Sequence, residues 1–442
     1  MLQETVLNIG FDDTDSPKGM CTTFLAYKIV DLLQKQKTEF LDFPRLIRFN
    51  PNIPWKTRGN GAVSLKIKTK NPSKIKNQIK NLVSKYSDIK NGANPGLVFF
   101  ESDTIPAEFV EFSNLALWQL IKRDHAKKFA EKNNLEFFYQ GNGQGLVGAI
   151  GAIGYDFQDH TLELLSYRKR AKFGKERKLS SQSVKIMQEK TFPNTFNSFD
   201  TKKGRVLITP HGPDPVFYGV RGENVDSLVY ATTILKSDEK LDGYMIFKSN
   251  QGTGDHLKNE LNFENMKPYA SGQITGIVSN TPKIEKGGHV FFKILSKNHE
   301  FWCAVYKPTG ISSVASNLIK GDKICVGGGV RKASKKFSRI INLEFIDVIS
   351  LAKNLAKTNP HCKKCNKRMK SKGRNQGFQC IRCGKKSSKK TTVEISRKVK
   401  KQLYIPELSA HRHLTRPLQR IGKSNKTSKF DKSLSWFCVY GN

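Results

Sequence analysis

The chain has 442 residues, 37% of them hydrophobic, which is enough for two to four globular domains and excludes a largely disordered protein. It contains no run of 18 apolar residues, and aspartates interrupt any signal-peptide pattern near the start, so we expect no membrane span and a cytoplasmic protein. Lys and Arg number 76 against 38 Asp and Glu, and the formal net charge of +38 predicts a polyanionic partner such as a nucleic acid.

An acidic loop near the start has the residue types of a phosphate site. It lies between a predicted strand at Thr5–Ile9 and a predicted helix at Phe24–Lys35. The helix start attracts anions, whereas carboxylates repel them, so the combination indicates a bridging Mg²⁺ ion. A capped helix after an acidic turn is the simpler alternative. The candidate residues are Asp12, Asp13, Asp15, Gly19, Thr22 and Thr23.

A basic loop follows between two further predicted strands, Arg45–Phe49 and Ala62–Ile67. Its candidate phosphate contacts are Arg45, Arg48, Lys56 and Arg58, which flank a Gly-Asn-Gly turn. Each of them alone is typical of a solvated surface. The chain has no Walker A pattern, so any ATP chemistry requires a different phosphate-binding loop.

The next part of the chain contains a weak dinucleotide motif. Gly143–Gly148 matches GxGxxG, but the glycine-interrupted run Leu146–Gly154 does not predict a helix, so we reject NAD binding and expect tight packing. We expect strands at Leu162–Arg168 and Met245–Gln251, an apolar turn at 214–223, and a helix after Glu223. His256 is predicted to lie in a surface loop.

Five short predicted strands with Gly, Asn and Pro turns between them fall in residues 267–350 and indicate a small barrel of the OB type. Such a barrel binds single-stranded nucleic acid by stacking and charge. The stacking candidates are Phe291, Phe292, Trp302 and Tyr306, about half of which must instead lie in the core.

Two CxxC pairs give the most specific spacing in the chain. Cys362, Cys365, Cys380 and Cys383 form a CxxC–x14–CxxC pattern that predicts one structural, tetrahedral Zn²⁺ ion in a zinc ribbon. Eighteen Lys and Arg against one Glu between residues 353 and 401 indicate a nucleic-acid surface. The basic, aromatic tail from residue 403 is expected to become ordered on binding RNA.

The motifs in this order resemble those of the archaeal 2-agmatinylcytidine synthetases. The resemblance rests on the following segments: 10–16, 19–23, 43–48, 56–64, 94–96, 145–149, 218–223 and 287–292. It implies an α+β multidomain protein with these parts: a kinase-like α/β catalytic domain (1–125), a ferredoxin-like domain (126–262), an OB-fold (267–350), a zinc ribbon (355–402) and a basic C-terminal tail (403–442).

The resemblance also implies an activity. The family is an ATP-dependent C–N ligase that attaches agmatine to C2 of the wobble cytidine of the isoleucine tRNA with a CAU anticodon, which enables decoding of AUA. ATP is cleaved to AMP and pyrophosphate, and a phosphorylated cytidine is the intermediate. No membrane and no obligatory protein partner is implied.

The resemblance assigns roles to residues of this chain. Asp12, Asp13 and Asp15 are expected to hold Mg²⁺ and ATP, and Thr22 matches the position that is phosphorylated. Our choices for stabilising phosphate charge are Arg45, Lys56 and Arg58. For agmatine we choose Gly145, Gly148, Tyr218, Gly222 and Glu223, because a guanidinium pairs with carboxylates. Asp214 departs from the family pattern. A carboxylate that touches the substrate is one interpretation, and a surface replacement is the one that we prefer.

Two other classes of protein remain open. A non-enzymatic nucleic-acid-binding protein accounts for the charge and the cysteines, but not for the acidic loop and the roughly 260 residues around it. A Mg²⁺-dependent nuclease would use the same carboxylates without ATP.

Overall fold

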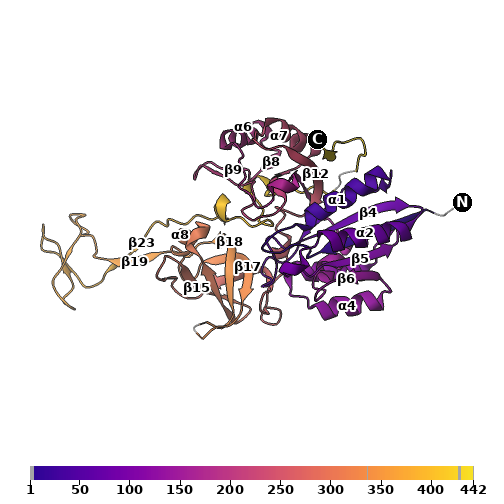
Figure 1. Cartoon of the computed structure of the whole chain (residues 1–442). Helices are drawn as coiled ribbons and strands as arrows, with labels where there is room; N and C mark the ends of the chain where they lie inside the picture. Colours follow the sequence, from indigo (N-terminus) through magenta and orange to yellow (C-terminus); the bar gives the residue numbers. More distant parts are fainter. Residues whose placement is uncertain (1–3, 336, 427–429, 442) are drawn as a thin grey trace. The chain divides into compact units, whose positions relative to one another are not determined.

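Figure 1 shows the helices and strands of the chain in a computed structural model that describes residues 4–335, 337–426 and 430–441. The chain divides into two compact units. The first unit comprises Met1–Gln273, Gly327–Arg339 and Ile405–Asn442, and the second comprises Ile274–Val326 and Ile340–Tyr404. Among the described residues, no helix has both the length and the apolar character that a bilayer crossing requires.

The first unit is built on one mixed sheet, in which the described residues form eleven strands. Across the sheet they are β6 (Glu136–Tyr139), β5 (Gly96–Glu101), β1 (Thr5–Asp12), β4 (Gly61–Thr69), β3 (Arg45–Arg48), β12 (Leu241–Ser249), β7 (Thr161–Arg168), β11 (Val216–Gly222) and β8 (Thr195–Phe196), with β2 (Glu39–Phe40) beside β4 and β25 (Phe437–Val439) beside β12. Apart from the parallel pair β3–β12, the recorded neighbours are antiparallel. The sheet and its helices agree with the mixed α+β class that we expected, and the sheet is mainly antiparallel.

Helices cover both faces of this sheet. They are α1 (Thr22–Lys35), α2 (Pro72–Tyr86), α3 (Ala107–Trp118), α4 (Arg123–Lys132), α5 (Leu146–Gly154), α6 (Ser181–Thr191) and α7 (Val225–Ile234). Ile9 of β1 shares one buried cluster with residues of α1, α2, α6 and α7. Val98 of β5 shares another cluster with residues of α3, α4 and α5. A small hairpin, β9 (Phe199–Asp200) with β10 (Arg205–Val206), lies outside the main sheet.

Helix α5 overturns one prediction. Residues 146–154 were not expected to be helical, yet they form a buried helix against β1. Its glycines allow this close approach: a Cβ on Gly10 of β1 would lie 2.1 Å from the Ala149 carbonyl oxygen, and one on Gly148 would lie 2.0 Å from Asp12 Oδ2. Tertiary packing has overridden low helix propensity, and the tight packing that we expected is present.

Three further predictions in this unit were wrong. The apolar turn at 214–223 contains strand β11, because residues 216–222 pair with β7 on one side and β8 on the other. His256 is fully buried rather than in a surface loop, because the short 3-10 helix Asp255–Leu257 that carries it is itself buried.

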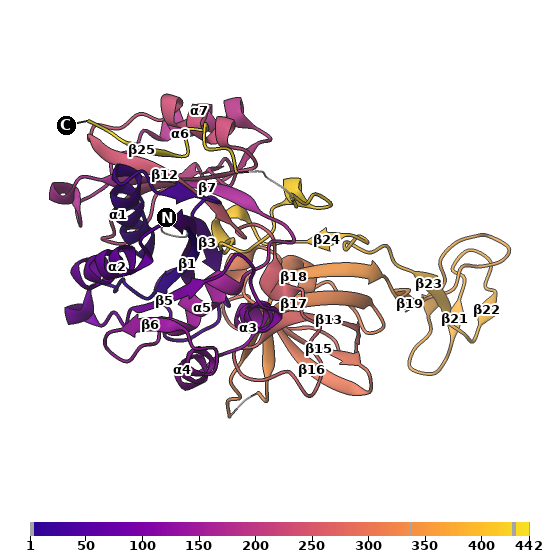
Figure 2. The same ribbon diagram turned by 90° about the vertical axis from the view of Figure 1, so that its right-hand side faces the viewer.

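The third wrong prediction concerns the C-terminal tail. From Ile405 onward, its described residues form part of the first unit: β25 lies beside β12 (Figure 2), and Trp436 is buried against Phe40, Phe43 and Phe430. The described part of the tail therefore packs against the first unit through these aromatic side chains, whereas we expected a segment that becomes ordered on binding RNA.

The second unit contains a ribbon and most of a closed five-strand barrel, of which the start of β13 and the end of β17 belong to the first unit. The barrel order is β13 (Ser271–Val278), β17 (Lys323–Arg331), β18 (Ile340–Ser350), β16 (His299–Val305) and β15 (Val290–Ser296), which closes on β13, with β14 (Lys283–Ile284) beside β15, β24 (Leu403–Tyr404) beside β18 and a short helix α8 (Ser312–Ala315). All five strands were predicted. Phe292 is core, whereas Phe291, Trp302 and Tyr306 are partly exposed.

The ribbon has two small sheets. They are β19 (Leu355–Thr358) with β23 (Thr391–Glu394), and β20 (Lys370–Ser371), β21 (Phe378–Gln379) and β22 (Lys386–Ser387). Arg397 connects the end of the ribbon to the barrel, since its guanidinium donates two hydrogen bonds to Asp322, at 3.0 and 2.7 Å.

Candidate active site

The acidic loop follows β1 and lines a cleft of about 770 Å³ in the first unit. Asp12 ends the strand, and Asp13 follows with a positive φ of 56°. Burial raises the pKa of Asp12 to about 7 and that of Asp13 to about 8, and repulsion from neighbouring carboxylates contributes to both shifts. Asp15 accepts hydrogen bonds from Thr57 Oγ1 at 3.0 Å and Arg58 Nη1 at 2.9 Å. The structure therefore places all three aspartates in one cleft, with Asp15 already engaged by the basic loop.

The donor set of this loop suits Mg²⁺ bound together with a phosphate. Among the described residues, the only group of three or more Asp, Glu, His or Cys ligand atoms within 4.8 Å of one another is the cysteine group, so the aspartates do not form a complete cage. Mg²⁺ is commonly held by one or two carboxylates, and phosphates and water complete its shell. The adjacent Asp12 and Asp13 fit that requirement, and their raised pKa values indicate carboxylates that a cation would stabilise.

Helix α1 begins at the cleft. Thr22 and Thr23 are its first residues, both are buried, and both line the cleft. Cys21 is the N-cap residue and makes no side-chain capping hydrogen bond. The hydroxyl of Thr14 donates to Thr22 Oγ1 at 3.1 Å. A helix start without a capping side chain has N–H groups that are free for an anion.

The basic loop supplies cations to the same cleft. Lys56 and Arg58 line it, and Arg58 also donates to the Met20 carbonyl at 2.8 Å. Arg45 does not line it, because its guanidinium donates to the Tyr155 carbonyl and lies over the Phe157 ring. Arg48 lines the cleft instead. Successive residues of a strand point to opposite faces, so positions 45 and 48 of β3 cannot both face the cleft.

Two arginines share one buried carboxylate deeper in the cleft. Arg221 Nε lies 3.3 Å from Glu163 Oε1, and Arg48 Nη2 lies 3.7 Å from Glu163 Oε2. All three side chains line the cleft, and the Glu163 side chain is only 3% exposed. We call these three residues the basic cluster. Two guanidinium groups and one carboxylate leave a net positive charge that favours an anion.

The loop Pro210–Val216 forms another part of the lining and carries Asp214. Asp214 is 2% exposed, so our interpretation of it as a surface residue was wrong. Its Oδ1 accepts from the Val216 N–H at 3.1 Å, whereas Oδ2 has no hydrogen-bond partner among the described residues and lies 3.8 Å from Arg58 Nε. Arg177 holds the loop, because its guanidinium donates to the carbonyls of Pro210, Gly212, Asp214 and Val216 at 2.7–3.1 Å.

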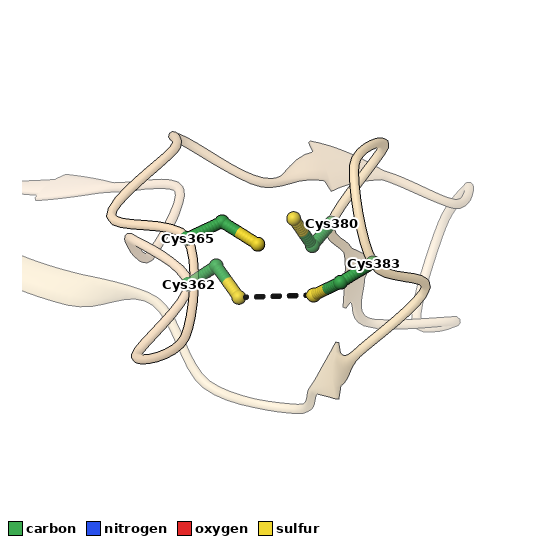
Figure 3. A group of neighbouring side chains, drawn as sticks. All are labelled: Cys362, Cys365, Cys380 and Cys383. Atoms are coloured by element: carbon green, nitrogen blue, oxygen red, sulfur yellow. Dashed lines mark hydrogen bonds between the residues drawn. The ribbon is translucent and has the colours of Figure 1, made fainter.

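The four cysteines of the ribbon come together as predicted (Figure 3). Their sulfur atoms all lie within 4.8 Å of one another. Both CxxC turns have the same hydrogen bonds: the N–H of Cys362 donates to the Lys367 carbonyl and that of Cys380 to the Lys385 carbonyl, each at 2.9 Å. Four thiolates from two such turns fit a tetrahedral Zn²⁺ ion and leave it no open position, so the site suits a structural role.

Comparison with known proteins gives matches along the whole chain. Family models match at residues 8–72 (TiaS TCKD domain), 143–256 (TiaS FLD domain) and 359–399 (TiaS C-terminal zinc ribbon domain). The chain is 46% identical over 439 residues to the isoleucine tRNA 2-agmatinylcytidine synthetase TiaS of Cenarchaeum symbiosum, with 99% of this chain and 98% of that protein covered. It is 39% identical to the TiaS of Thermococcus sibiricus, with 95% and 97% covered. The chain belongs to the TiaS family.

Solved structures of TiaS agree with this assignment. The crystal structure of apo TiaS matches with a TM-score of 0.85 and 35% identity. The complex of TiaS with its isoleucine tRNA and ATP matches with a TM-score of 0.84 and 34% identity, and the complex with the tRNA, AMPCPP and agmatine with 0.82 and 32%. Each alignment covers 94% of this chain and 97% of the other. The mixed α+β architecture, the barrel and the zinc ribbon are thus those of the TiaS family.

Of the residues that we predicted for agmatine, only Gly148 lines the cleft. Gly145 packs against backbone, since a Cβ there would lie 2.4 Å from the Gly96 nitrogen. Tyr218 is a buried core residue, and Gly222 packs against the Asn194 carbonyl. Glu223 accepts hydrogen bonds from Arg420 and from Asn425 Nδ2. These four residues therefore do not line the cleft.

Arg48, a candidate phosphate contact, lines the cleft, whereas four other cleft residues were missing from our predicted site: Glu163, Asp214, Arg221 and His413. A hint of the role of Glu163 was present in the sequence, because this acidic residue lies within the apolar run Leu162–Leu165. Arg221 lies within a segment that carries the family resemblance. His413 offered none, because it follows the zinc ribbon and lies 192 residues from its partner Arg221 along the chain.

Proposed function

We propose that this protein is an isoleucine tRNA 2-agmatinylcytidine synthetase, an ATP-dependent C–N ligase that joins agmatine to C2 of the wobble cytidine of the CAU isoleucine tRNA. The observation that carries the proposal is one cleft in which an acidic loop, an uncapped helix start and basic side chains meet, in a chain that aligns with TiaS proteins over nearly its full length. The charge of +38 suits a tRNA substrate.

In this proposal, one part of the cleft handles phosphate. Asp12 and Asp13 hold Mg²⁺, which when bound neutralises charge on the ATP phosphates. Thr22, at the start of α1, is the hydroxyl placed to accept a phosphate. Lys56 and Arg58 then balance the charge that develops during phosphate transfer. Asp15 acts by orienting Arg58, which it contacts at 2.9 Å.

The amine substrate requires an anionic contact, and we assign that role to Asp214 in place of Glu223. Support comes from its burial, its position in the cleft lining and an Oδ2 atom that accepts no hydrogen bond from the described residues. A carboxylate of this kind suits the cationic agmatine. Arg58 Nε lies 3.8 Å from the same oxygen, so agmatine would share this carboxylate with Arg58.

The remaining parts retain the roles given by the resemblance. We propose a kinase-like catalytic part, a ferredoxin-like part, an OB-fold, and a zinc ribbon with structural Zn²⁺, working as a cytoplasmic enzyme without an obligatory protein partner. The packing of α5 on β1 favours a boundary between the first two parts after Gly154 rather than at residue 125.

Nucleoside mass spectrometry tests this function. A CAU isoleucine tRNA transcript is incubated with the protein, ATP, Mg²⁺ and agmatine. We expect the wobble cytidine to gain the mass of agmatine minus water, and only when ATP is present. An unmodified but tightly bound transcript would favour a binding protein, and a cut transcript would favour a nuclease.

A further inference from the structure

The segment that follows the zinc ribbon returns to the first unit and forms part of the cleft lining. Its residues Leu408, Ser409 and His411–Leu414 line the cleft. Main-chain hydrogen bonds hold it: the N–H of Gly252 donates to the His413 carbonyl at 2.9 Å, and that of Gly254 to the Leu414 carbonyl at 2.8 Å. Farther along, Arg416 and Arg420 each donate to the Asp159 carboxylate, at 2.6 and 2.7 Å.

His413 contacts the basic cluster through one ring nitrogen. Arg221 Nη2 lies 2.9 Å from His413 Nδ1, and Gln251 Oε1 lies 2.8 Å from the same atom. Gln251 is fully buried, and its Nε2 donates to Glu163. The ring therefore contacts both the arginine and the glutamine that surround this carboxylate.

Two contacts at Nδ1 bear on the protonation state of the ring. A guanidinium can only donate, so a hydrogen bond from Arg221 requires the lone pair of Nδ1 and puts the ring proton on Nε2. The Gln251 oxygen favours the opposite tautomer, but the hydrogen bond from the charged guanidinium is the stronger of the two. Burial, together with the charges of Arg48, Arg221 and Lys56, lowers the pKa of His413 well below its usual value, so the ring is neutral near pH 7. A protonated ring would place two cations against each other.

Gly59 of the basic loop limits the space around the His413 ring on the side of Cδ2. A Cβ on Gly59 would lie 2.5 Å from His413 Cδ2 and 2.8 Å from Arg48 Nη1. Gly59 does not have a positive φ, so backbone conformation does not explain the glycine. Its place in the basic loop is instead explained by the space that the ring and Arg48 occupy.

We propose that His413 is a positioning residue of the cleft: its Nδ1 accepts a hydrogen bond from Arg221 and so directs the guanidinium, together with Glu163, toward the anionic part of the substrate. The segment after the zinc ribbon is then part of the catalytic body. The inference rests on the proposed function for its kinetic consequence, but the contact itself can be tested separately.

Replacements that mimic one ring nitrogen at a time test the proposal. Asn places an amide oxygen near the position of Nδ1, and Gln places one near Nε2. We compare His413→Asn, His413→Gln and His413→Ala in the agmatine incorporation assay, with Leu418→Ala as control, because Leu418 is 63% exposed on the same segment. Loss of a hydrogen bond from a charged group predicts a fall in kcat of about tenfold to a hundredfold for Ala and Gln.

The expected pattern is that His413→Asn restores most of kcat, that His413→Gln does not, and that the KM for agmatine changes little in any variant. Gly59→Ala should resemble His413→Ala, and the double variant should be no worse than either single one. Equal rescue by Gln and Asn, or full activity of His413→Ala, would overturn the proposal.

A spectroscopic readout separates this inference from the proposed function. In protein labelled with ¹⁵N-histidine, the His413 signals, assigned by their loss in His413→Asn, should show a proton on Nε2 and no titration between pH 5.5 and 8. A ring protonated at Nδ1, or one that titrates in this range, refutes the inference even if agmatine is incorporated. If the wild type incorporates no agmatine but the ring behaves as expected, the proposed function fails and the contact stands.

Discussion

Arg177 holds the loop that carries Asp214, so its removal should open that loop without unfolding the sheet. Its side chain is 8% exposed and donates to four main-chain carbonyls, at 2.8, 3.1, 2.8 and 2.7 Å. The four contacts are not additive, because freed carbonyls become hydrated when the loop opens. We therefore take the cost of breaking one buried charged contact, about 3–5 kcal/mol.

That cost predicts a large change in local opening. At about 1.4 kcal/mol for each factor of ten, the opening equilibrium of Pro210–Val216 in Arg177→Ala should rise by about 10² to 10³·⁵. Hydrogen exchange followed by mass spectrometry on peptides covering 208–218 measures it directly. Arg177→Lys, with three donors on one nitrogen, should show a smaller increase.

The matched control is Arg170→Ala, because Arg170 is exposed on the neighbouring 3-10 helix. Its exchange in 208–218 should equal that of the wild type. The KM for agmatine should rise in Arg177→Ala, because Asp214 is no longer held in place. Unchanged exchange and an unchanged KM in Arg177→Ala would refute the role given to this side chain.

Three further outcomes are expected. The pKa values of Asp12 and Asp13 are raised on folding, so without metal these two residues stabilise the folded state less as the pH rises from about 4 toward 7–8. Mg²⁺ should therefore raise the thermal midpoint more at pH 8 than at pH 5.5. An equal rise at both pH values would contradict this. Replacing Cys365 by Ser, or adding a chelator, should expose residues 359–399 to protease and leave the first unit resistant, whereas an intact ribbon would exclude structural zinc. The Arg420 side chain is 1% exposed and forms ion pairs with Asp159 and Glu223. In Arg420→Ala, trypsin should therefore release the C-terminal tail at a lower temperature than in the Lys423→Ala control. Release at the same temperature would show that these ion pairs do not anchor the tail.

Local patterns were sufficient to predict much of the fold. The five barrel strands and the paired cysteines were found because alternation and CxxC spacing are encoded over short stretches. Asn224 was expected to start a helix, and it caps α7 by accepting from the Ser227 N–H at 2.9 Å.

The errors came from contacts between distant parts of the chain. Helix α5 forms because glycines let it pack on β1, which no local propensity reveals. The tail folds because Trp436 enters the core of the first unit, almost 400 residues away from Phe40 in sequence.

Contacts between distant parts of the chain also explain which residues of the candidate site were predicted correctly and which were not. The acidic and basic loops were predicted because each is continuous in sequence, and both line the cleft. Glu223 was chosen for its charge, but its oxygen is bound by Arg420 from the tail. Asp214 was placed at the surface, but the loop held by Arg177 buries it in the cleft. Pairings of this kind depend on the assembled fold.

The measurement that tests the central claim most directly compares the wild type with Asp12→Asn. Both are incubated with the CAU isoleucine tRNA, ATP, Mg²⁺ and agmatine, and the wobble nucleoside is analysed by mass spectrometry while tRNA binding is measured in parallel. We predict agmatine incorporation by the wild type only, with nearly equal tRNA binding by both proteins. Incorporation by Asp12→Asn at the wild-type rate would contradict the assigned metal site, and no incorporation by either protein would contradict the proposed function.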